Sequence, residues 1–205
     1  MTNLHAAFAA YVKQNIWPEF KQLGYKKSGN NFRFYNSSGW GKMLQFQFSH
    51  WNSEQEARFT VNVSFYLPEV AQYLLKREPG ATFSEHICIV RKRLGNLKPA
   101  KRDEWYTIQE GVDPTPVFAQ LSADITQYAL PFLATVDSQE DIFSILAGGY
   151  KSYYIPAQIN AMYRAGYHEA AIRMLADDLA RTNLNEHYQA TLLKLAQELG
   201  IQLAA

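Results

Sequence analysis

A histidine and a cysteine lie two residues apart near the middle of the chain, at His86 and Cys88. The segment from His86 to Arg93 has the composition of a short strand, and residues two apart on a strand share a face. A thiol beside an imidazole is the beginning of a nucleophilic dyad. A lone cysteine is more often a small buried hydrophobic residue, and we favour that interpretation. We therefore expect Cys88 to be buried and unreactive, and we assign no catalytic residue.

Amides and hydroxyls alternate with apolar side chains along two segments, residues 44–49 and 59–65. This period of two is typical of strands with one buried face and one polar face. Amides on adjacent strands can present convergent hydrogen-bonding groups to a ligand or a peptide. An antiparallel sheet also often exposes a polar face to water without any binding role, and the pattern leaves both interpretations open. The candidate binding residues on this face are Gln45, Gln47, Thr60 and Asn62.

Basic residues are concentrated just before two aromatic residues, Trp105 and Tyr106. Basic groups beside aromatic rings can hold a phosphate and stack on a base. The alternative is a solvated strand end and loop, where lysines keep the edge of the sheet soluble. We predict that a specific partner contacts the polar face around Gln47 and Asn62 together with Arg93 and Trp105. The basic side chains of the segment are Arg91, Lys92, Arg93, Lys98, Lys101 and Arg102.

The sequence lacks the familiar catalytic and metal-binding motifs. It has no glycine-rich phosphate loop, no HExxH, no paired cysteine spacing and no Gly-x-Ser-x-Gly elbow. Its five histidines are dispersed, and none lies at metal spacing from a second ligand type. We therefore expect no cofactor and no metal, and we predict a noncatalytic binding or protein-interaction module. Its partner would be another protein or a small ligand, and a binder of nucleic acid or of a phosphorylated small ligand is the alternative.

The charge balance and the cysteine count limit the classes of partner and compartment. Lys and Arg number 20 and Asp and Glu 19, so the net charge of +1 gives no overall attraction to nucleic acid or to an anionic membrane. A single cysteine cannot form an internal disulfide, and the sequence has neither a leader pattern nor a long apolar run. We expect a cytoplasmic protein without a membrane role, and we do not favour nucleic acid as its partner.

An antiparallel sheet would position the candidate residues. The patterns predict strands at residues 32–35, 44–49 and 59–65, which form a meander, and shorter strands at 86–93 and 105–108. The alternation directs apolar side chains toward the helices and the amides to the opposite face. These apolar side chains are Phe46, Phe48, Val61 and Val63.

Helices precede and follow these strands. Apolar residues from Leu4 to Leu23 have helical spacing, and Pro18 removes one backbone donor, which predicts a kink or a break near Trp17. A short helix is expected at residues 69–77. A further helix is expected at residues 114–133, broken at Pro131.

One set of short motifs follows the chain in order: Gly24-Tyr25-Lys26-Lys27-Ser28-Gly29 followed by Phe32, then Gln47-Phe48-Ser49, Phe59-Thr60-Val61-Asn62-Val63, Arg93-Leu94-Gly95-Asn96-Leu97, Trp105 and Leu130-Pro131-Phe132. These motifs resemble those of one known family, the domain of unknown function 4304 family. The resemblance covers about the first two-thirds of the chain, and it implies an α+β fold. Three positions depart from the family pattern, where Tyr25 replaces Phe, Ser64 replaces Gly and Tyr106 replaces Trp. The family has no established activity, so the resemblance transfers no catalytic residue.

The composition changes to helix formers from Asp137 onward, which predicts an all-helical extension. The residues from Ala165 to Ile172 resemble one tetratricopeptide-type hairpin. Such repeats need about three stacked units for stability and none recurs here, so we favour a lone helical hairpin. We divide the chain into an α+β domain at 1–136 and a helical extension at 137–205. Within the extension, helices are expected at residues 139–146, 156–164, 169–181 and 186–199.

Overall fold

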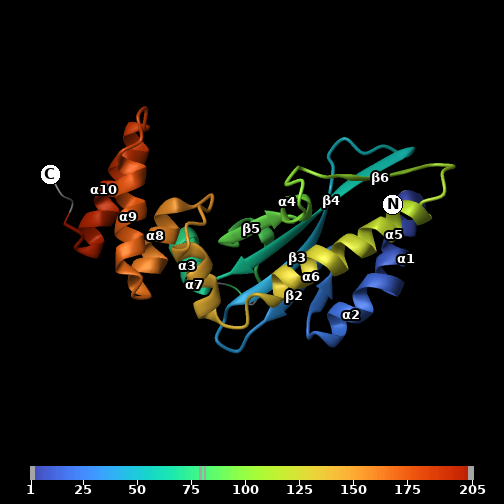
Figure 1. Ribbon diagram of the computed structural model, residues 1–205, viewed down its shortest axis with the longest axis horizontal. Coiled ribbons are helices and arrows are strands. Elements are labelled where there is room, and N and C mark those ends of the chain that lie inside the picture. The colour runs from blue at the N-terminus through green and yellow to red at the C-terminus, as the bar shows by residue number, and fades with distance from the viewer. Residues whose placement is uncertain (1–2, 79, 81, 203–205) are drawn as a thin grey trace. The chain divides into compact units, whose positions relative to one another are not determined.

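The computed structural model describes residues 3–78, 80 and 82–202. Their contacts divide them into two compact units. Unit 1 consists of residues 3–65 and 91–137, and unit 2 of the described residues between 66 and 90 and from 138 to 202. The fold is α+β, as predicted, with a six-stranded antiparallel sheet and C-terminal helices (Figure 1).

The sheet has the strand order β1-β2-β3-β4-β5, and β6 pairs with β4. Strand β6 lies antiparallel to the first half of β4, where Phe59 is opposite Tyr106. Strand β1 was not predicted because its three residues are all exposed and show no alternation. The strands are β1 (Lys26–Ser28), β2 (Asn31–Tyr35), β3 (Gly41–Phe48), β4 (Glu56–Tyr66), β5 (Val90–Arg93) and β6 (Tyr106–Gln109).

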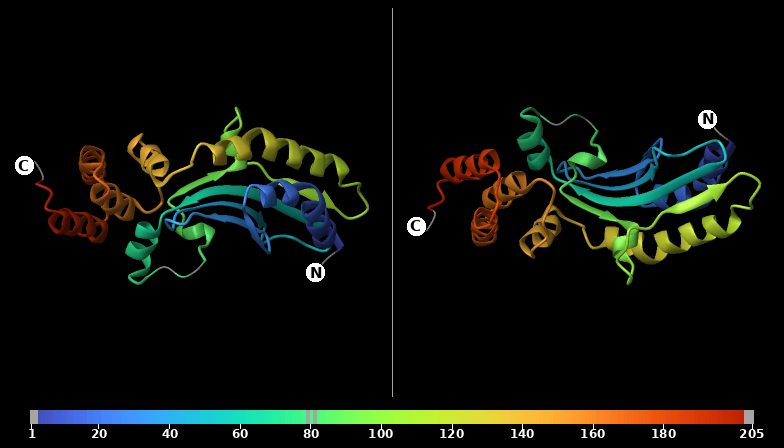
Figure 2. Two further views of the ribbon diagram at one scale, coloured as in Figure 1. Left: turned by 90° about the horizontal axis from the view of Figure 1, so that it is seen from below. Right: turned by 90° about the horizontal axis from the view of Figure 1, so that it is seen from above.

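The apolar face of the sheet packs against two long helical segments, as the alternation predicted. Phe8 in the first segment contacts Phe46 and Phe59 of the sheet at ring-centroid distances of 5.2 and 4.6 Å, and it also contacts Phe118 in the second segment. In both views of Figure 2 the second segment, coloured yellow-green to yellow, runs along one side of the sheet. The first segment is α1 (Asn3–Tyr11), η1 (Val12–Ile16) and α2 (Trp17–Gln22), and the second is α5 (Thr115–Asp124), η3 (Ile125–Ala129) and α6 (Leu130–Ala134).

A π-helical turn precedes the internal proline of each long segment. The turn η1 ends two residues before Pro18, and η3 ends two residues before Pro131. Proline lacks the N–H of the normal helical hydrogen bond and clashes with the carbonyl four residues earlier, and a wider turn accommodates both effects. The predicted break at Pro131 is therefore wrong, because the helix continues through the proline by way of η3.

The segment around Cys88 differs from the predicted strand. Residues Glu85–Ile87 form the 3-10 helix η2, and β5 begins only at Val90. His86 is exposed, whereas Cys88 is fully buried and its Sγ lies 3.6 Å from the Ser84 carbonyl. The two side chains do not share a strand face, so the thiol–imidazole pair suggested by their spacing is not formed. The expected burial of Cys88 is confirmed.

Apart from the 3-10 helix η2, the described helices of unit 2 have bounds that agree with the predicted ones to within two residues. Helices α8 and α9 pack as a hairpin, and both contact α10. Helix α3 also packs on α8, so residues 66–90 group with the C-terminal helices although they lie inside the range 1–136. The division of the chain at residue 136 stays a prediction. The helices are α3 (Pro68–Leu75), α7 (Gln139–Ala147), α8 (Ile155–Arg164), α9 (His168–Leu179) and α10 (Glu186–Leu199).

The helices of unit 2 are fixed by local caps and by buried polar contacts. Ser138 forms a capping box with Asp141 at the start of α7. The Asp178 carboxylate is buried in α9 and accepts a hydrogen bond of 2.6 Å from the Tyr188 hydroxyl in α10. Of the described helices, none is long and apolar enough to cross a membrane.

Candidate functional site

The polar face of the sheet brings together three of the amides that the alternation selected. Asn62 Nδ2 donates to Gln45 Oε1 at 3.0 Å and to Gln47 Oε1 at 2.9 Å. Gln45 Nε2 in turn donates to Asn31 Oδ1 at 3.0 Å on the neighbouring strand. The amides therefore largely satisfy one another. We infer that their first role is to fix the register of β2, β3 and β4.

The same face is less accessible than a solvated sheet face. Thr60 is fully buried, and its hydroxyl donates to the Glu104 carbonyl at 2.9 Å. Asn62 has an exposed fraction of 5%, while Gln45 and Gln47 are half-buried. The interpretation of a merely wetted outer face is therefore wrong for Thr60 and Asn62. A binding role for the predicted set stays a prediction.

Trp105 lies within cation–π distance of two guanidinium groups, those of Arg93 in β5 and Arg58 in β4. The Cζ atoms of Arg93 and Arg58 are 5.1 and 5.9 Å from the Trp105 ring. One nitrogen of Arg93 donates to both oxygens of Asp103, at 2.5 and 2.6 Å, and this contact lowers the pKa of the carboxyl. The predicted residues Arg93 and Trp105 are therefore in contact, but the guanidinium of Arg93 already forms an ion pair with Asp103.

A buried cluster around Asp124 holds the segment between β5 and β6. Asp124 Oδ2 accepts hydrogen bonds from the Tyr106 hydroxyl at 2.6 Å and from Lys98 Nζ at 2.9 Å. Gln120 donates to the other oxygen of Asp124 at 2.9 Å, and Glu104 pairs with Lys98 at 2.8 Å. Burial opposes the charge of Lys98, but its hydrogen bonds to the two carboxylates raise its pKa. Lys98 is therefore paired with two carboxylates inside the fold, so the basic segment has one ammonium group fewer with which to bind a phosphate.

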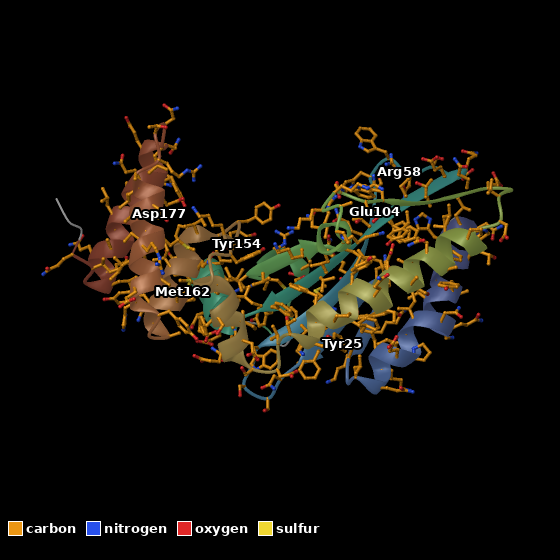
Figure 3. All side chains as sticks on the ribbon, viewed as in Figure 1. Tyr25, Arg58, Glu104, Tyr154, Met162 and Asp177 are labelled. Atoms are coloured by element: carbon orange, nitrogen blue, oxygen red, sulfur yellow. The ribbon has the colours of Figure 1, made fainter. Side chains whose placement is uncertain are left out.

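Unit 1 also contains a cleft that was not predicted from the sequence. It has a volume of about 590 Å³ and lies between the end of α2, strands β2 and β3, and helix α6. Figure 3 labels Tyr25 at this cleft, well separated from Arg58 and Glu104 at the other side of the unit. Its lining residues are Glu19, Leu23, Tyr25, Phe34, Lys42, Thr126, Leu130, Pro131, Leu133, Ala134 and Asp137.

Lys42 places an ammonium group in this largely apolar cleft. It is opposite Phe34 in the register of β2 and β3, and its parity along β3 directs it to the same face as Phe46. The Lys42 side chain has an exposed fraction of 11%. Its Nζ donates to the Leu133 carbonyl at 3.0 Å and to Asp137 Oδ1 at 3.4 Å.

Aromatic rings and a helix end stabilise this cation. Nζ of Lys42 lies 5.6 Å from the ring centroid of Phe34 and 5.8 Å from that of Trp40, within the range of cation–π attraction. The Leu133 carbonyl belongs to the last turn of α6, where the backbone dipoles of a helix present partial negative charge.

Tyr25 supplies a further polar group of the cleft. Gly24 has a φ of +82°, which suits glycine, and this turn ends α2 and directs the chain into Tyr25. The Tyr25 ring packs against Phe20 and Phe34, and burial raises the pKa of its hydroxyl. Within the described part of the chain the Tyr25 hydroxyl has no hydrogen-bond partner. It is therefore a neutral donor and acceptor for a ligand at neutral pH.

The comparisons with known proteins concern the fold that carries this cleft. The model of a family described as Domain of unknown function (DUF4304) matches residues 16–135, more than half of the chain. The chain belongs to the DUF4304 family. Both Tyr25 and Lys42 lie inside the DUF4304 match, whereas Asp137 lies two residues beyond its end. No curated protein and no solved structure matches the chain, so no ligand is indicated by these comparisons.

The sequence contained two signals for this DUF4304 cleft. Tyr25 is one of the departures from the family pattern, and Lys42 falls in register with the apolar series Leu44, Phe46 and Phe48. A lysine at an inward position of a strand indicates a buried charge that needs partners. The distance of 95 residues between Lys42 and its carboxylate partner Asp137 hid the arrangement.

Proposed function

We propose that this DUF4304 protein is a noncatalytic binding module that holds a small, largely apolar molecule in the cleft at Tyr25 and Lys42. The observation that carries the proposal is the cleft itself. It has a volume of about 590 Å³ and largely apolar walls, and its polar lining groups are the Lys42 ammonium, the hydroxyls of Tyr25 and Thr126, and the carboxylates of Glu19 and Asp137. Small-molecule sites typically occupy about 300–1,000 Å³ and combine apolar walls with a few polar groups that orient the ligand.

The ionisable groups of the cleft favour binding over catalysis. Burial raises the pKa of Tyr25, so its hydroxyl stays protonated at neutral pH and cannot serve as a base. Lys42 is held by the Leu133 carbonyl and by Asp137. Nothing in this set forms the nucleophile and base pair that covalent catalysis needs. The arrangement instead supports recognition by shape, by apolar contact and by a few hydrogen-bonding groups, Tyr25 and Lys42 among them.

The cleft also favours a small ligand over the other partner classes. A concave site encloses most of the surface of a small molecule, whereas protein interfaces are typically larger and flatter. The basic segment offers less support for nucleic acid because Arg93 and Lys98 are paired with carboxylates. Nucleic acid or a phosphorylated ligand stays the alternative, and a steep salt dependence of binding would favour it. The single cysteine is in keeping with a cytoplasmic location, which we also propose.

The test uses phenylnaphthylamine, an uncharged fluorescent probe, and the full chain. The informative variant is Leu23→Asp, because Leu23 lines the cleft and is 51% exposed, so a carboxylate there leaves the core intact. Leu193→Asp is the matched control, since Leu193 in α10 is 46% exposed and does not line the cleft. We expect saturable binding that Leu23→Asp weakens about tenfold, because losing an apolar contact worth about 1.4 kcal/mol changes affinity by that factor.

Leu193→Asp should bind the probe as the parent chain does. If the parent chain does not bind the probe, or if both variants weaken binding equally, the cleft is not the ligand site. Circular dichroism and an unchanged unfolding midpoint of each variant show that the fold is retained.

A further inference from the structure

The ammonium of Lys42 has less counter-charge than its burial requires. A lysine with an exposed fraction of 11% has lost most of its hydration, and such a charge is normally paired with a close carboxylate. Its nearest carboxylate oxygen, on Asp137, is 3.4 Å away, longer than a strong charge-assisted hydrogen bond of about 2.7–2.9 Å. Among the described residues only the Leu133 carbonyl and Asp137 accept from Nζ, so one of its three protons has no acceptor.

The ion pair between Asp137 and Lys42 is weak. Its side chain is 89% exposed, so water solvates its charge well and screens its attraction to the ammonium. It lies in the short connection between α6 and α7, outside both helices. The attraction of such a carboxylate to Nζ is therefore weaker than that of a buried one. A ligand anion that reaches Nζ from inside the cleft would be screened less and could approach closer.

We propose that the ligand of this cleft carries one negatively charged oxyanion, such as a carboxylate, which takes the place of Asp137 on Lys42 Nζ. This inference rests on the proposed function, because it names the chemistry of the molecule that the cleft binds. Leu23, Phe34 and Leu130 contact the apolar body of the ligand. The Tyr25 hydroxyl supplies a neutral hydrogen bond to it.

The other charged groups of the cleft limit the ligand to a single negative charge. Glu19 lines the cleft together with Asp137, and both carboxylates repel an anion. A ligand with one charge placed at Lys42 exchanges one carboxylate for another. A second charge would meet Glu19 without a further ammonium to offset it. The site therefore suits an apolar acid and disfavours a nucleotide or another polyphosphate.

The test compares two probes with the same aromatic rings, of which only one is charged. Anilinonaphthalene sulfonate carries one sulfonate, and phenylnaphthylamine carries none. We define the anion preference as the affinity for the sulfonate divided by the affinity for the neutral probe. This ratio cancels changes in the shape of the cleft, because both probes fill it with the same rings. Both affinities are measured by fluorescence titration of the full chain at one fixed ionic strength.

Three charge variants give distinct expectations. Lys42→Met should lower the anion preference at least tenfold, because the ammonium that binds the sulfonate is removed. Asp137→Asn should raise it about fivefold, because the competing carboxylate is neutralised without a change in size. The matched control is Asp177→Asn, which changes the net charge equally at an exposed position of α9 (labelled in Figure 3) and should leave the preference within twofold of the parent value.

The outcomes separate this inference from the proposed function. If the neutral probe binds at the cleft but Asp137→Asn changes the anion preference no more than Asp177→Asn does, displacement of Asp137 is wrong and the proposed function stands. An anion preference unaffected by Lys42→Met likewise overturns the inference alone. If neither probe binds the parent chain, both the proposed function and the inference fall.

Discussion

Removing the Asp124 carboxylate should destabilise unit 1 strongly, because three side chains donate to it. The carboxylate is buried, with an exposed side-chain fraction of 3%, and it accepts from Tyr106, Lys98 and Gln120. In Asp124→Ala the Tyr106 hydroxyl and the Gln120 amide lose an acceptor, and Lys98 keeps only Glu104 as a close carboxylate. One substitution thus removes an acceptor from all three donors.

The magnitude follows from the burial of Asp124 and Tyr106, whereas Gln120 is exposed and contributes little. Removing one partner of a buried ion pair costs about 3–5 kcal/mol, and each unsatisfied buried donor costs about 1–3 kcal/mol. Lys98 retains Glu104 and an exposed side-chain fraction of 18%, which places the expected cost near the lower end, about 3 kcal/mol in the free energy of unfolding. Asp124→Asn keeps an acceptor oxygen of the same size, so it should cost about 1–2 kcal/mol.

Urea unfolding followed by tryptophan fluorescence measures this loss in the relevant unit. All four tryptophans, Trp17, Trp40, Trp51 and Trp105, belong to unit 1, so the signal reports its unfolding. The matched control is Asp177→Ala, an identical substitution at an exposed helical position, which should change the free energy by less than about 0.5 kcal/mol. A cost below about 1 kcal/mol for Asp124→Ala would refute our view that this cluster holds the segment between β5 and β6.

Four other perturbations have expected outcomes that the same contacts determine. Asn62→Ala should lower the free energy of unfolding in urea by about 1–3 kcal/mol, since it leaves two glutamine acceptors without their donor, and a loss below about 0.5 kcal/mol would show that this network is dispensable. Burial raises the pKa of Tyr25 and of Tyr106 above the unfolded value of about 10, so the stability that their neutral hydroxyls contribute is complete below that pH and decreases as the pH rises past it. In urea titrations from neutral to alkaline pH, the free energy of unfolding should therefore fall less in the two Tyr→Phe variants than in the parent chain. An equal fall in the variants and the parent would contradict this. Cys88 should resist alkylation in the native protein because it is fully buried, and rapid labelling at neutral pH would disprove this. A chain limited to residues 1–136 should keep a strand-rich circular dichroism spectrum but lose solubility, because α3 loses the helix α8 on which it packs. A soluble fragment that unfolds cooperatively would show that α3 does not need this contact with α8.

The sheet could be predicted because its central strands alternate over many residues. Phe59, Val61, Val63 and Phe65 are all fully buried, and the intervening polar residues lie on the other face. The strand predicted at His86 began too early because a 3-10 turn of mixed composition cannot be distinguished from a strand by local pattern. Strand β1 has no buried side chain, so hydrophobic periodicity gave no signal for it.

The polar face was predicted correctly in membership but not in accessibility. The alternation placed Gln45, Gln47 and Asn62 on one face, and the three amides are hydrogen-bonded there. Whether such groups bind one another or a ligand depends on the register of β3 against β4 and on what covers the face, and neither can be derived from one strand's pattern. For the same reason the meeting of Lys42 with Leu133 and Asp137 required the tertiary structure.

The most direct test of our central claim is an NMR titration of the full chain, labelled at its leucine methyl groups, with phenylnaphthylamine. Three leucines, Leu23, Leu130 and Leu133, line the cleft and would report its occupation. We predict that the methyl signals of these three residues shift in a saturable way, while those of Leu192 and Leu195, buried in α10, do not. Shifts that spare the cleft leucines, or that spread equally to the α10 leucines, would contradict the proposal that this cleft is the binding site.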